Sequence, residues 1–273
     1  MPDLFLTWQL DPVLLGGLLT LAFSYTLLIG PLRSRLAPAA PVPWRKALFF
    51  YAGIGVMYLA EGSPLHDLAE RYLFSAHMLQ HLIVNYCVAS LIIWGLPTWI
   101  LRPMLLNSAI APISRFITKP LVALILFNLL FSVWHIPVIY DSALQNTNLH
   151  HVEHLIFLGI SVLFWWPLMS PLPELPRASG LVQLLYLFAT PLLQLPLFGM
   201  VTFAGQSLYE TYSAAPQIWL SPVNDQAVGG ALMKVLSLFG YGIPFIIIFF
   251  RWYREERHSG RRSSWFSQRP KTS

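Results

Sequence analysis

Residues 72–96 read YLFSAHMLQHLIVNYCVASLIIWGL, an apolar run without a single charged side chain. About 20 mostly apolar residues are enough for an α-helix to cross the hydrocarbon core of a bilayer. His77 and His81 lie in the first half of this run, where an imidazole is costly unless it has a partner or binds a metal. The run therefore predicts a transmembrane helix with a polar site inside it.

The composition of the whole chain points the same way. Of the 273 residues, 56% are hydrophobic and only 11% are charged, whereas soluble domains carry about a quarter charged residues. Six further runs are long enough to span, or nearly so: 13–31, 46–62, 119–136, 150–169, 181–203 and 229–250. We therefore predict an all-α, polytopic membrane bundle with seven transmembrane helices. Its single domain comprises residues 1–250, with a loop over the outer surface at 204–228 and a basic, flexible tail at 251–273.

The placement of basic residues predicts the orientation of the bundle. All but two of the 17 Lys and Arg residues fall in the first, third and fifth connections and in the tail. By the positive-inside rule these segments are cytoplasmic, so the amino terminus lies outside and the carboxyl terminus inside. The first run lacks a basic flank and a cleavage site, so it is expected to stay as a helix. The net charge of +5 then reflects topology and contact with anionic lipid, not nucleic acid.

The histidines are distributed on one side. With this topology, seven of the eight fall at or near the outer face, and only His258, in the tail, lies on the other side. The seven are His66, His77, His81, His135, His150, His151 and His154. Because imidazole is a common metal ligand, the one-sided cluster indicates metal or haem chemistry at the outer face.

The motif HMLQH in the third predicted helix carries the clearest signal. His77 and His81 are four residues apart and share one helical face, and Met78 borders that face. Imidazole and thioether ligands together favour copper(I). The alternative is a pair of histidines that hydrogen-bond between helices. The single cysteine, Cys87, excludes an internal disulfide and is expected to be a buried thiol deeper in the same helix.

Two further motifs bring histidines to the same depth. In WHIPVIYDSAL, His135 ends the fourth predicted helix, and Asp141 either caps the next turn or supports a metal ligand from behind. In HHVEH, His150 and His154 share a face of the fifth predicted helix, and Glu153 could orient one of them.

The other two outer histidines are less tied to this face. His151 points elsewhere or pairs with His154. His66 lies in EGSPLHDLAE, which is expected to be a loop that covers the site.

The motifs SPLHDLAERYLFSAHMLQHL, WHIPVIYDSAL, HHVEHLIFLGISVLFWWPLM and DQAVGGALMKV, in this order, resemble the CtaG-type, caa3-associated family of cytochrome c oxidase assembly factors. The resemblance runs from the second predicted helix to the seventh. It implies a multi-pass protein of the bacterial cytoplasmic membrane that is needed to make active haem–copper oxidase, with a proposed role in supplying copper. The family's motifs carry over to His77, His81, His135 and His154.

We therefore expect copper(I) to be held as cargo between the third, fourth and fifth predicted helices. His77, His81 and His154 are the first candidate ligands, and His135 and Met78 the next. An oxidase subunit would dock laterally and take the copper by ligand exchange, and a periplasmic or extracellular donor would supply it. On this reading the protein is not an enzyme.

Three alternatives stay open. Histidines on opposing helices also hold haem in membrane cytochromes. A metal-dependent membrane oxidoreductase or hydrolase is less favoured, because HMLQH lacks the glutamate of the HExxH motif and only outer-loop acids are expected nearby. A transporter would break its helices at prolines, but the inner half of the bundle offers no polar path.

Overall fold

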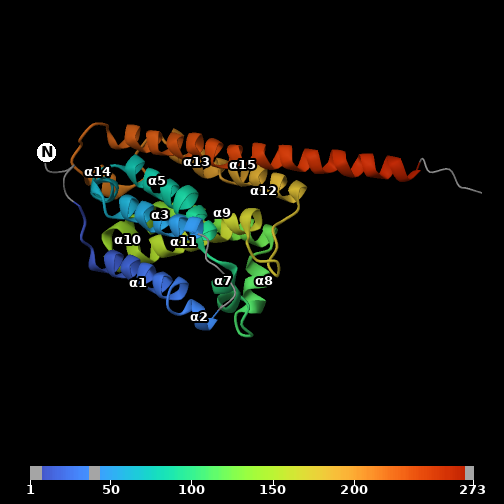
Figure 1. Ribbon diagram of the computed structural model, residues 1–273. Helices are drawn as coiled ribbons and strands as arrows, with labels where there is room; N and C mark the ends of the chain where they lie inside the picture. The colour runs from blue at the N-terminus through green and yellow to red at the C-terminus, as the bar shows by residue number, and fades with distance from the viewer. Residues whose placement is uncertain (1–7, 37–43, 268–273) are drawn as a thin grey trace, which may run out of the picture.

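The computed structural model describes residues 8–36 and 44–267, and within them the chain is helical without any β-strand (Figure 1). The first half contains α1 (Pro12–Ile29), α2 (Arg33–Leu36), α3 (Trp44–Glu61), α4 (Pro64–Arg71), α5 (Phe74–Ile83), the π-helical segment η2 (Val84–Val88), α6 (Ala89–Gly95), α7 (Thr98–Leu105) and α8 (Ala111–Ile117). The second half contains α9 (Pro120–Trp134), α10 (Pro137–Gln145), α11 (Thr147–Met169), α12 (Gly180–Leu193), α13 (Leu195–Phe203), α14 (Glu210–Ala214) and α15 (Pro222–Ser267). The predicted all-α class is confirmed.

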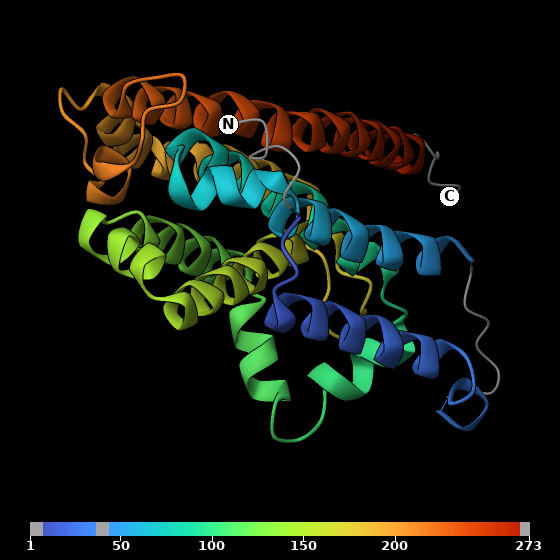
Figure 2. The same cartoon turned by 90° about the vertical axis from the view of Figure 1, so that its left-hand side faces the viewer.

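The long helices run back and forth between two ends of one bundle (Figures 1 and 2). One end of the bundle, which we call the histidine end, contains α4, α10 and α14. The opposite end, which we call the basic end, contains α2, α7 and α8. The continuous helix formed by α5, η2 and α6 lies in contact with α3, α11 and α15. At the basic end, Lys46 Nζ of α3 donates to the carbonyl oxygens of Trp94 and Leu96 at 3.2 and 3.1 Å. This contact ties the start of α3 to the end of α6.

Seven spans remain a prediction. By length and composition, five segments of the described chain could cross a membrane: α1, α5 to α6, α11, α12 to α13, and Pro222–Arg257 of α15. The pair α8 and α9 adds a sixth if its 79° bend lies within one span. The second predicted span corresponds to α3, which has 18 residues and carries Arg45, Lys46 and Glu61 near its ends. The fourth corresponds to α9, which has only 15 residues.

Two adjacent glycines let α15 lie against its neighbours. A Cβ atom on Gly229 would come within 2.4 Å of Phe74 Cδ1 in α5, and one on Gly230 within 2.3 Å of Thr202 Oγ1 in α13. Both distances are too short for any side chain, so the backbones can approach only where glycine stands. The GG of the DQAVGGALMKV motif therefore determines how closely α15 packs on the helix that carries HMLQH.

The stretch 204–228, predicted as a surface loop, is partly helical and partly buried. It contains α14, and α15 begins at Pro222, seven residues before the predicted start at 229. The first turn of α15 is held by Asp225, whose carboxylate accepts hydrogen bonds from the Ser75 hydroxyl and backbone N–H in α5. At its other end α15 continues beyond residue 250 as far as Ser267, so the tail that the sequence predicts as flexible begins as helix.

The π-helical turn η2 changes which residues of the central helix face inward. A π turn contains an extra residue, which loosens the regular ladder and rotates the residues that follow. The carbonyl of Asn85, in this turn, accepts a hydrogen bond from Trp165 Nε1 of α11 at 2.7 Å. Cys87 is exposed on the surface of the bundle, so the prediction of a buried thiol was wrong.

Candidate metal centre

Six of the seven outer histidines form one cluster at the histidine end. Neighbouring ring centroids within it lie 4.2–6.3 Å apart. The members of this histidine cluster are His66 of α4, His77 and His81 of α5, His135 after α9, and His150 and His154 of α11. His151 faces the other way, and its Nε2 atom lies 3.4 Å from Asp11 Oδ2 at the start of α1. The structure thus brings together every predicted outer histidine except His151.

Local sequence signals start the helices that position these rings. Ser63 and Pro64 begin α4, with the Ser63 hydroxyl accepting from Leu65 N at 3.3 Å. His66 therefore lies in a helix, whereas the sequence predicted a covering loop. Asn146 caps α11 by accepting from Leu149 N at 3.1 Å, which places the HHVEH motif in the first turns. The expected start of this helix, residue 150, is three residues late.

The innermost part of the cluster is the triad His77, His81 and His154. Ligand atoms of these three side chains all lie within 4.8 Å of one another. The Nε2 atoms of His77 and His81 face each other at 2.9 Å, and both residues are buried. We call this set the inner triad. Three imidazoles in this arrangement can hold one metal ion, provided that each presents an unprotonated nitrogen.

Close contacts indicate the tautomers of two of the imidazoles. His154 Nδ1 lies 2.6 Å from Glu61 Oε2, a contact that favours a proton on Nδ1 and a lone pair on Nε2. His135 Nδ1 donates to the carbonyl oxygen of Phe131 at 2.7 Å, which leaves its Nε2 lone pair facing Met78 Sδ at 3.3 Å. His135 and Met78 therefore present a nitrogen and a sulfur lone pair side by side. The His135–Met78 pair lies next to the inner triad, since the ring centroids of His81 and His135 are 6.3 Å apart.

Nearer the surface, His66, Glu70 and His150 form a second set, which we call the outer triad. Glu70 Oε1 lies 2.7 Å from His66 Nε2 and 2.5 Å from His150 Nε2. Burial raises the pKa of the Glu70 carboxyl group, but its contacts with His150 and His66 outweigh burial and lower the pKa below its ordinary value. Glu70 is therefore a carboxylate at neutral pH.

Several buried polar atoms of the cluster have no hydrogen-bond partner within the described part of the chain. They include both carboxylate oxygens of Glu153, Nδ1 of His81 and Nε2 of His154. The Glu153 side chain is only 1% exposed, and an isolated carboxylate is very costly at such a position. His150 Nδ1 lies 3.4 Å from Glu153 Oε2, and His150, Glu153 and His154 have ligand atoms within 4.8 Å of one another. Ligand atoms without hydrogen-bond partners in such a group fit a bound cation.

Three contributors were not anticipated as site residues: Glu61, Glu70 and Gln80. Gln80 Nε2 donates to Glu61 Oε2 at 2.5 Å and lies 3.0 Å from His66 Nδ1. By their place in the sequence, Glu61 and Glu70 are expected among the outer acids, and Glu153 and Asp141 are the carboxylates expected beside the histidines. Glu61 lies instead at the end of α3, 3% exposed and in contact with His154. One signal was present for Glu70, since it follows His66 by four residues and shares its helical face.

Tyrosines cover the cluster from the side of α14. The Tyr212 hydroxyl lies 2.6 Å from the Ala69 carbonyl, 2.9 Å from the Tyr140 hydroxyl and 3.4 Å from His77 Nδ1. The Tyr209 hydroxyl donates to the His135 carbonyl at 3.1 Å. The segment between α13 and α15 thus closes the histidine end.

Asp141 helps to hold this cover. Its two carboxylate oxygens accept hydrogen bonds from the backbone N–H groups of Glu210 and Thr211 at 3.0 and 3.1 Å. Of the two roles that the sequence left open, Asp141 caps a turn, but the turn is that of the distant α14 and not the one that follows in sequence.

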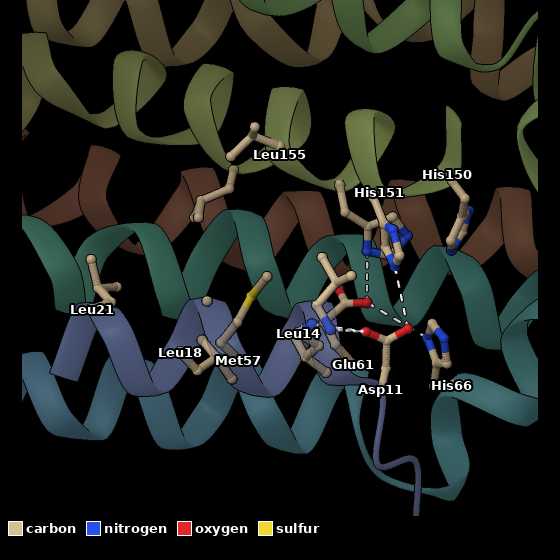
Figure 3. A pocket seen from close by; sticks show the side chains of 14 residues that line it. Asp11, Leu14, Leu18, Leu21, Met57, Glu61, His66, His150, His151 and Leu155 are labelled. Atoms are coloured by element: carbon tan, nitrogen blue, oxygen red, sulfur yellow. Dashed lines mark hydrogen bonds and ion pairs between the residues drawn. The ribbon is translucent and has the colours of Figure 1, made fainter. Parts of the chain in front are cut away.

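A cavity of about 420 Å³ adjoins the cluster between α1, α3 and α11 (Figure 3). Its apolar wall includes Leu14, Leu18, Leu21 and Met57, and its polar end contains Asp11, Glu61, His66, His150, His151 and His154. A smaller pocket of about 130 Å³ lies on the other side of the outer triad. It is lined mostly by polar side chains: Gln9, Asp11, His66, Asp67, Glu70, Arg71, Thr147, His150 and His151, with Leu144.

The fold and the cluster define a helical membrane protein with a buried histidine–carboxylate centre at one end. Within that class, the chain belongs to the cytochrome c oxidase caa3 assembly factor (Caa3_CtaG) family, whose model matches residues 23–255. The family resemblance seen in the sequence motifs is therefore confirmed.

More distant relatives are known from mycobacteria. Uncharacterized protein Mb0105 of Mycobacterium bovis and uncharacterized protein MT0111 of Mycobacterium tuberculosis are each 21% identical to this chain over 275 residues, which cover 93% of it. Uncharacterized protein ML1998 of Mycobacterium leprae is 21% identical over 272 residues, 92% of this chain. The chain spans 40% of the length of each of these relatives. No solved structure gives a significant match.

Proposed function

We propose that this protein binds copper in the histidine cluster and helps to deliver it to a haem–copper oxidase subunit during assembly. It would act in the bacterial cytoplasmic membrane with the histidine end facing outward, as the positive-inside rule predicts. The observation that carries the proposal is the inner triad, in which ligand atoms of His77, His81 and His154 lie within 4.8 Å of one another in a buried site. Because the chain belongs to an oxidase assembly family, we take an oxidase subunit as the recipient of the copper.

The donor set favours copper(I) among the possible cargoes. Imidazole and thioether groups are soft or borderline ligands, and a thioether is a poor ligand for hard cations such as Mg²⁺ or Ca²⁺. Met78 is fully buried, and its sulfur faces the unprotonated nitrogen of His135 at 3.3 Å. The inner triad and the His135–Met78 pair together offer copper(I) more ligands than it needs at once. Such a surplus suits an ion that is bound and then handed on.

The geometry is less suited to haem, which remains the alternative cargo. Two imidazoles that share one haem iron stand on opposite sides of the macrocycle, about 4 Å apart at twice a usual metal–nitrogen bond length. The Nε2 atoms of His77 and His81 lie 2.9 Å apart. These two imidazoles can share one ion placed to the side of the line between their nitrogens, but they cannot be the two axial ligands of one haem. A haem would have to take its ligands from different helices.

The cavity between α1, α3 and α11 offers a route for lateral transfer. Its polar end reaches His154 and Glu61, and Met57 lies further along its wall. A transmembrane helix of an oxidase subunit that docked beside α1 could present its own ligands there. Copper would then leave His154 by stepwise ligand exchange, without crossing the apolar half of the bundle. A periplasmic or extracellular donor would load the site from the opposite, polar pocket.

The carboxylates in the cluster favour one second candidate, a metal-dependent membrane oxidoreductase. Glu61, Glu70 and Glu153 all contact histidines of the cluster, and mixed nitrogen and oxygen ligands also suit iron. We favour a non-catalytic role because of the family and because Met78 is turned toward the ligands. Purified protein that contains iron in place of copper and turns over with oxygen would establish the second candidate.

The test uses protein purified in detergent, with metal content and optical spectrum measured before and after loading with copper(I). We expect one tightly bound copper(I), which the double variant His77→Ala, His81→Ala loses. His151→Ala is the matched control, since His151 faces α1 outside the cluster. In cells that lack the native gene, the double variant should fail to restore oxidase activity, whereas the native sequence should restore it. Unchanged copper content and unchanged oxidase maturation in the double variant would refute the proposal.

A further inference from the structure

The outer triad has the composition of a metal site of a different kind from the inner triad. Two imidazoles and one carboxylate form an N₂O set that suits borderline divalent ions such as Zn²⁺. Ligand atoms of His66, Glu70 and His150 all lie within 4.8 Å of one another. No thioether is among them. The inner triad also consists of imidazoles alone, but the thioether of Met78 lies beside it with His135, so a soft monovalent ion has more ligands to gain there.

The contact between His150 and Glu70 needs a cation. His150 Nδ1 lies 3.4 Å from Glu153 Oε2, so a neutral His150 keeps its proton on that side and turns the Nε2 lone pair toward Glu70. Nε2 and Glu70 Oε1 are 2.5 Å apart, and two lone pairs repel at that distance unless a proton or a metal ion lies between them. Within the described residues, neither of these two buried atoms has a partner with hydrogen-bond geometry. Atoms that are close but not aligned fit a metal ion placed to one side better than a shared proton.

The third ligand can also present a lone pair. His66 Nδ1 lies 3.0 Å from the Gln80 side-chain amide and 3.6 Å from Glu61 Oε2. The Gln80 amide turns its nitrogen to both groups, because Nε2 also donates to Glu61 Oε2. The carboxylate of Glu61 is therefore the group that favours a proton on His66 Nδ1. When Nδ1 carries the proton, Nε2 is left to bind an ion beside Glu70.

The outer triad is open to water, whereas the inner triad is buried. The side chains of His66 and Glu70 are 18% and 27% exposed, and both line the polar pocket of about 130 Å³. A divalent ion in this N₂O set keeps at least one coordination position for water, which the pocket can supply. The carboxylate of Asp11 in the same lining adds negative charge, whereas Asp67 there is paired with Arg71 at 3.5 Å.

We propose that His66, Glu70 and His150 form a second metal site, which binds a divalent cation of the Zn²⁺ class and joins α4 to α11 above the inner triad. The site is occupied independently of copper(I). The bound ion closes α4 over the buried histidines and stabilises the histidine end.

The experiment measures Zn²⁺ binding by calorimetry on detergent-purified protein. The background is the double variant His77→Ala, His81→Ala, so that the inner triad cannot contribute. We expect this background to bind one Zn²⁺ and its thermal unfolding midpoint to rise with Zn²⁺. Adding Glu70→Gln should lower the Zn²⁺ affinity by more than about 100-fold and abolish the shift, because loss of a supporting partner alone costs 10- to 100-fold. Adding Glu210→Gln, the same change at an exposed position of α14, should alter neither.

His66→Asn serves as a second test variant, should Glu70→Gln not fold, and the same loss is expected. The site is overturned if the background binds no Zn²⁺, if Glu70→Gln and His66→Asn bind it as well as the Glu210→Gln control, or if only an imidazolium at His150 is found by its titration in NMR. Copper(I) binding to protein with an intact inner triad is measured separately. Loss of copper(I) binding with Zn²⁺ binding intact defeats the proposed function alone, and the reverse result defeats the second site alone.

Discussion

The cluster is bordered by two very different helices, α5 and α1. Seven of the ten residues of α5 are buried, among them His77, Met78 and His81. Within α1, all of which the structure describes, Tyr25 is the one buried side chain. The ligands thus lie on the helix that is packed by α3, α11 and α15, and the cavity lies beside α1, whose main neighbours are α2 and α3. Rigidity on one side holds the ligands in place, and loose packing on the other leaves a way in or out.

The largest effect is expected when the tight packing of α5 is disturbed. Gly229→Val places side-chain atoms where Phe74 Cδ1 is only 2.4 Å from the Cβ position. We expect a loss of about 3 kcal/mol or more in the free energy of unfolding, at or above the upper range for overpacking. Thermal unfolding and the yield of monodisperse protein in detergent measure it.

The matched control lies on α1. Gly17 has no atom within 4 Å of its Cβ position, so Gly17→Val should change the stability by no more than about 0.5 kcal/mol. Equal stability of the two variants would show that α1 is packed as tightly as α5, against the comparison.

The next test concerns carboxylates on the two sides of the cavity. Glu61 holds His154 from α3 at 2.6 Å, whereas Asp11 caps α1 and contacts His151. Glu61→Gln should lower copper affinity 10- to 100-fold, the usual cost of losing a partner that orients a ligand. Asp11→Asn, which preserves the cap, should leave it unchanged. Competition with a copper(I) chelator gives both affinities, and an equal loss in the two variants would contradict the assignment of Glu61.

Substitution of two methionines tests whether a thioether belongs to the copper(I) ligand set. Met78 faces His135 within the core, and Met57 lines the cavity. Met78→Leu is close to isosteric and should cost less than about 1.5 kcal/mol in stability, but it should lower copper(I) affinity about tenfold, equivalent to 1.4 kcal/mol. Met57→Leu should bind copper(I) as the native protein does and slow only its transfer. Full affinity in Met78→Leu would remove the thioether from the ligand set.

The last test concerns the tyrosine cover, and its expected effect is on stability alone. Tyr212→Phe removes a hydroxyl that contacts Ala69 O and Tyr140, at a cost of about 1 kcal/mol for each buried hydrogen bond lost. Tyr253→Phe is the control, because Tyr253 is 43% exposed near the other end. Equal thermal unfolding midpoints for the two variants would show that the hydrogen bonds of the tyrosine cover do not stabilise the protein.

Much of the helical layout could be predicted, because apolar runs and their flanking charges are local properties of the chain. The clustering of the histidines could also be predicted, because HMLQH and HHVEH each place two rings on one helical face. The roles of Glu61 and Gln80 could not be predicted, because both depend on how the end of α3 meets α5 and α4. The exposure of Cys87 could not be predicted from its residue type or depth, because it depends on which face of the central helix its neighbours leave uncovered.

The number of spans and the extent of the outer segment show a different limit. Charged residues at the ends of α3 and the 79° bend before α9 make a span ambiguous by composition alone. Residues 204–228 looked like a loop because of their prolines and acids. Yet Pro222 starts α15 and Asp225 anchors it to Ser75, so the same residues begin a helix.

The shortness of α9 has a consequence for the membrane itself. At 1.5 Å per residue its 15 residues extend about 22 Å, less than the roughly 30 Å thickness of the hydrocarbon core. Its neighbour α11, with 23 residues, extends about 35 Å. As a membrane span, α9 would require the lipid next to it to become thinner, at a cost of a fraction of a kcal/mol per Å. We expect the bilayer to dip where α9 meets α10, so that a water-exposed donor could approach the level of His135 without any channel through the protein.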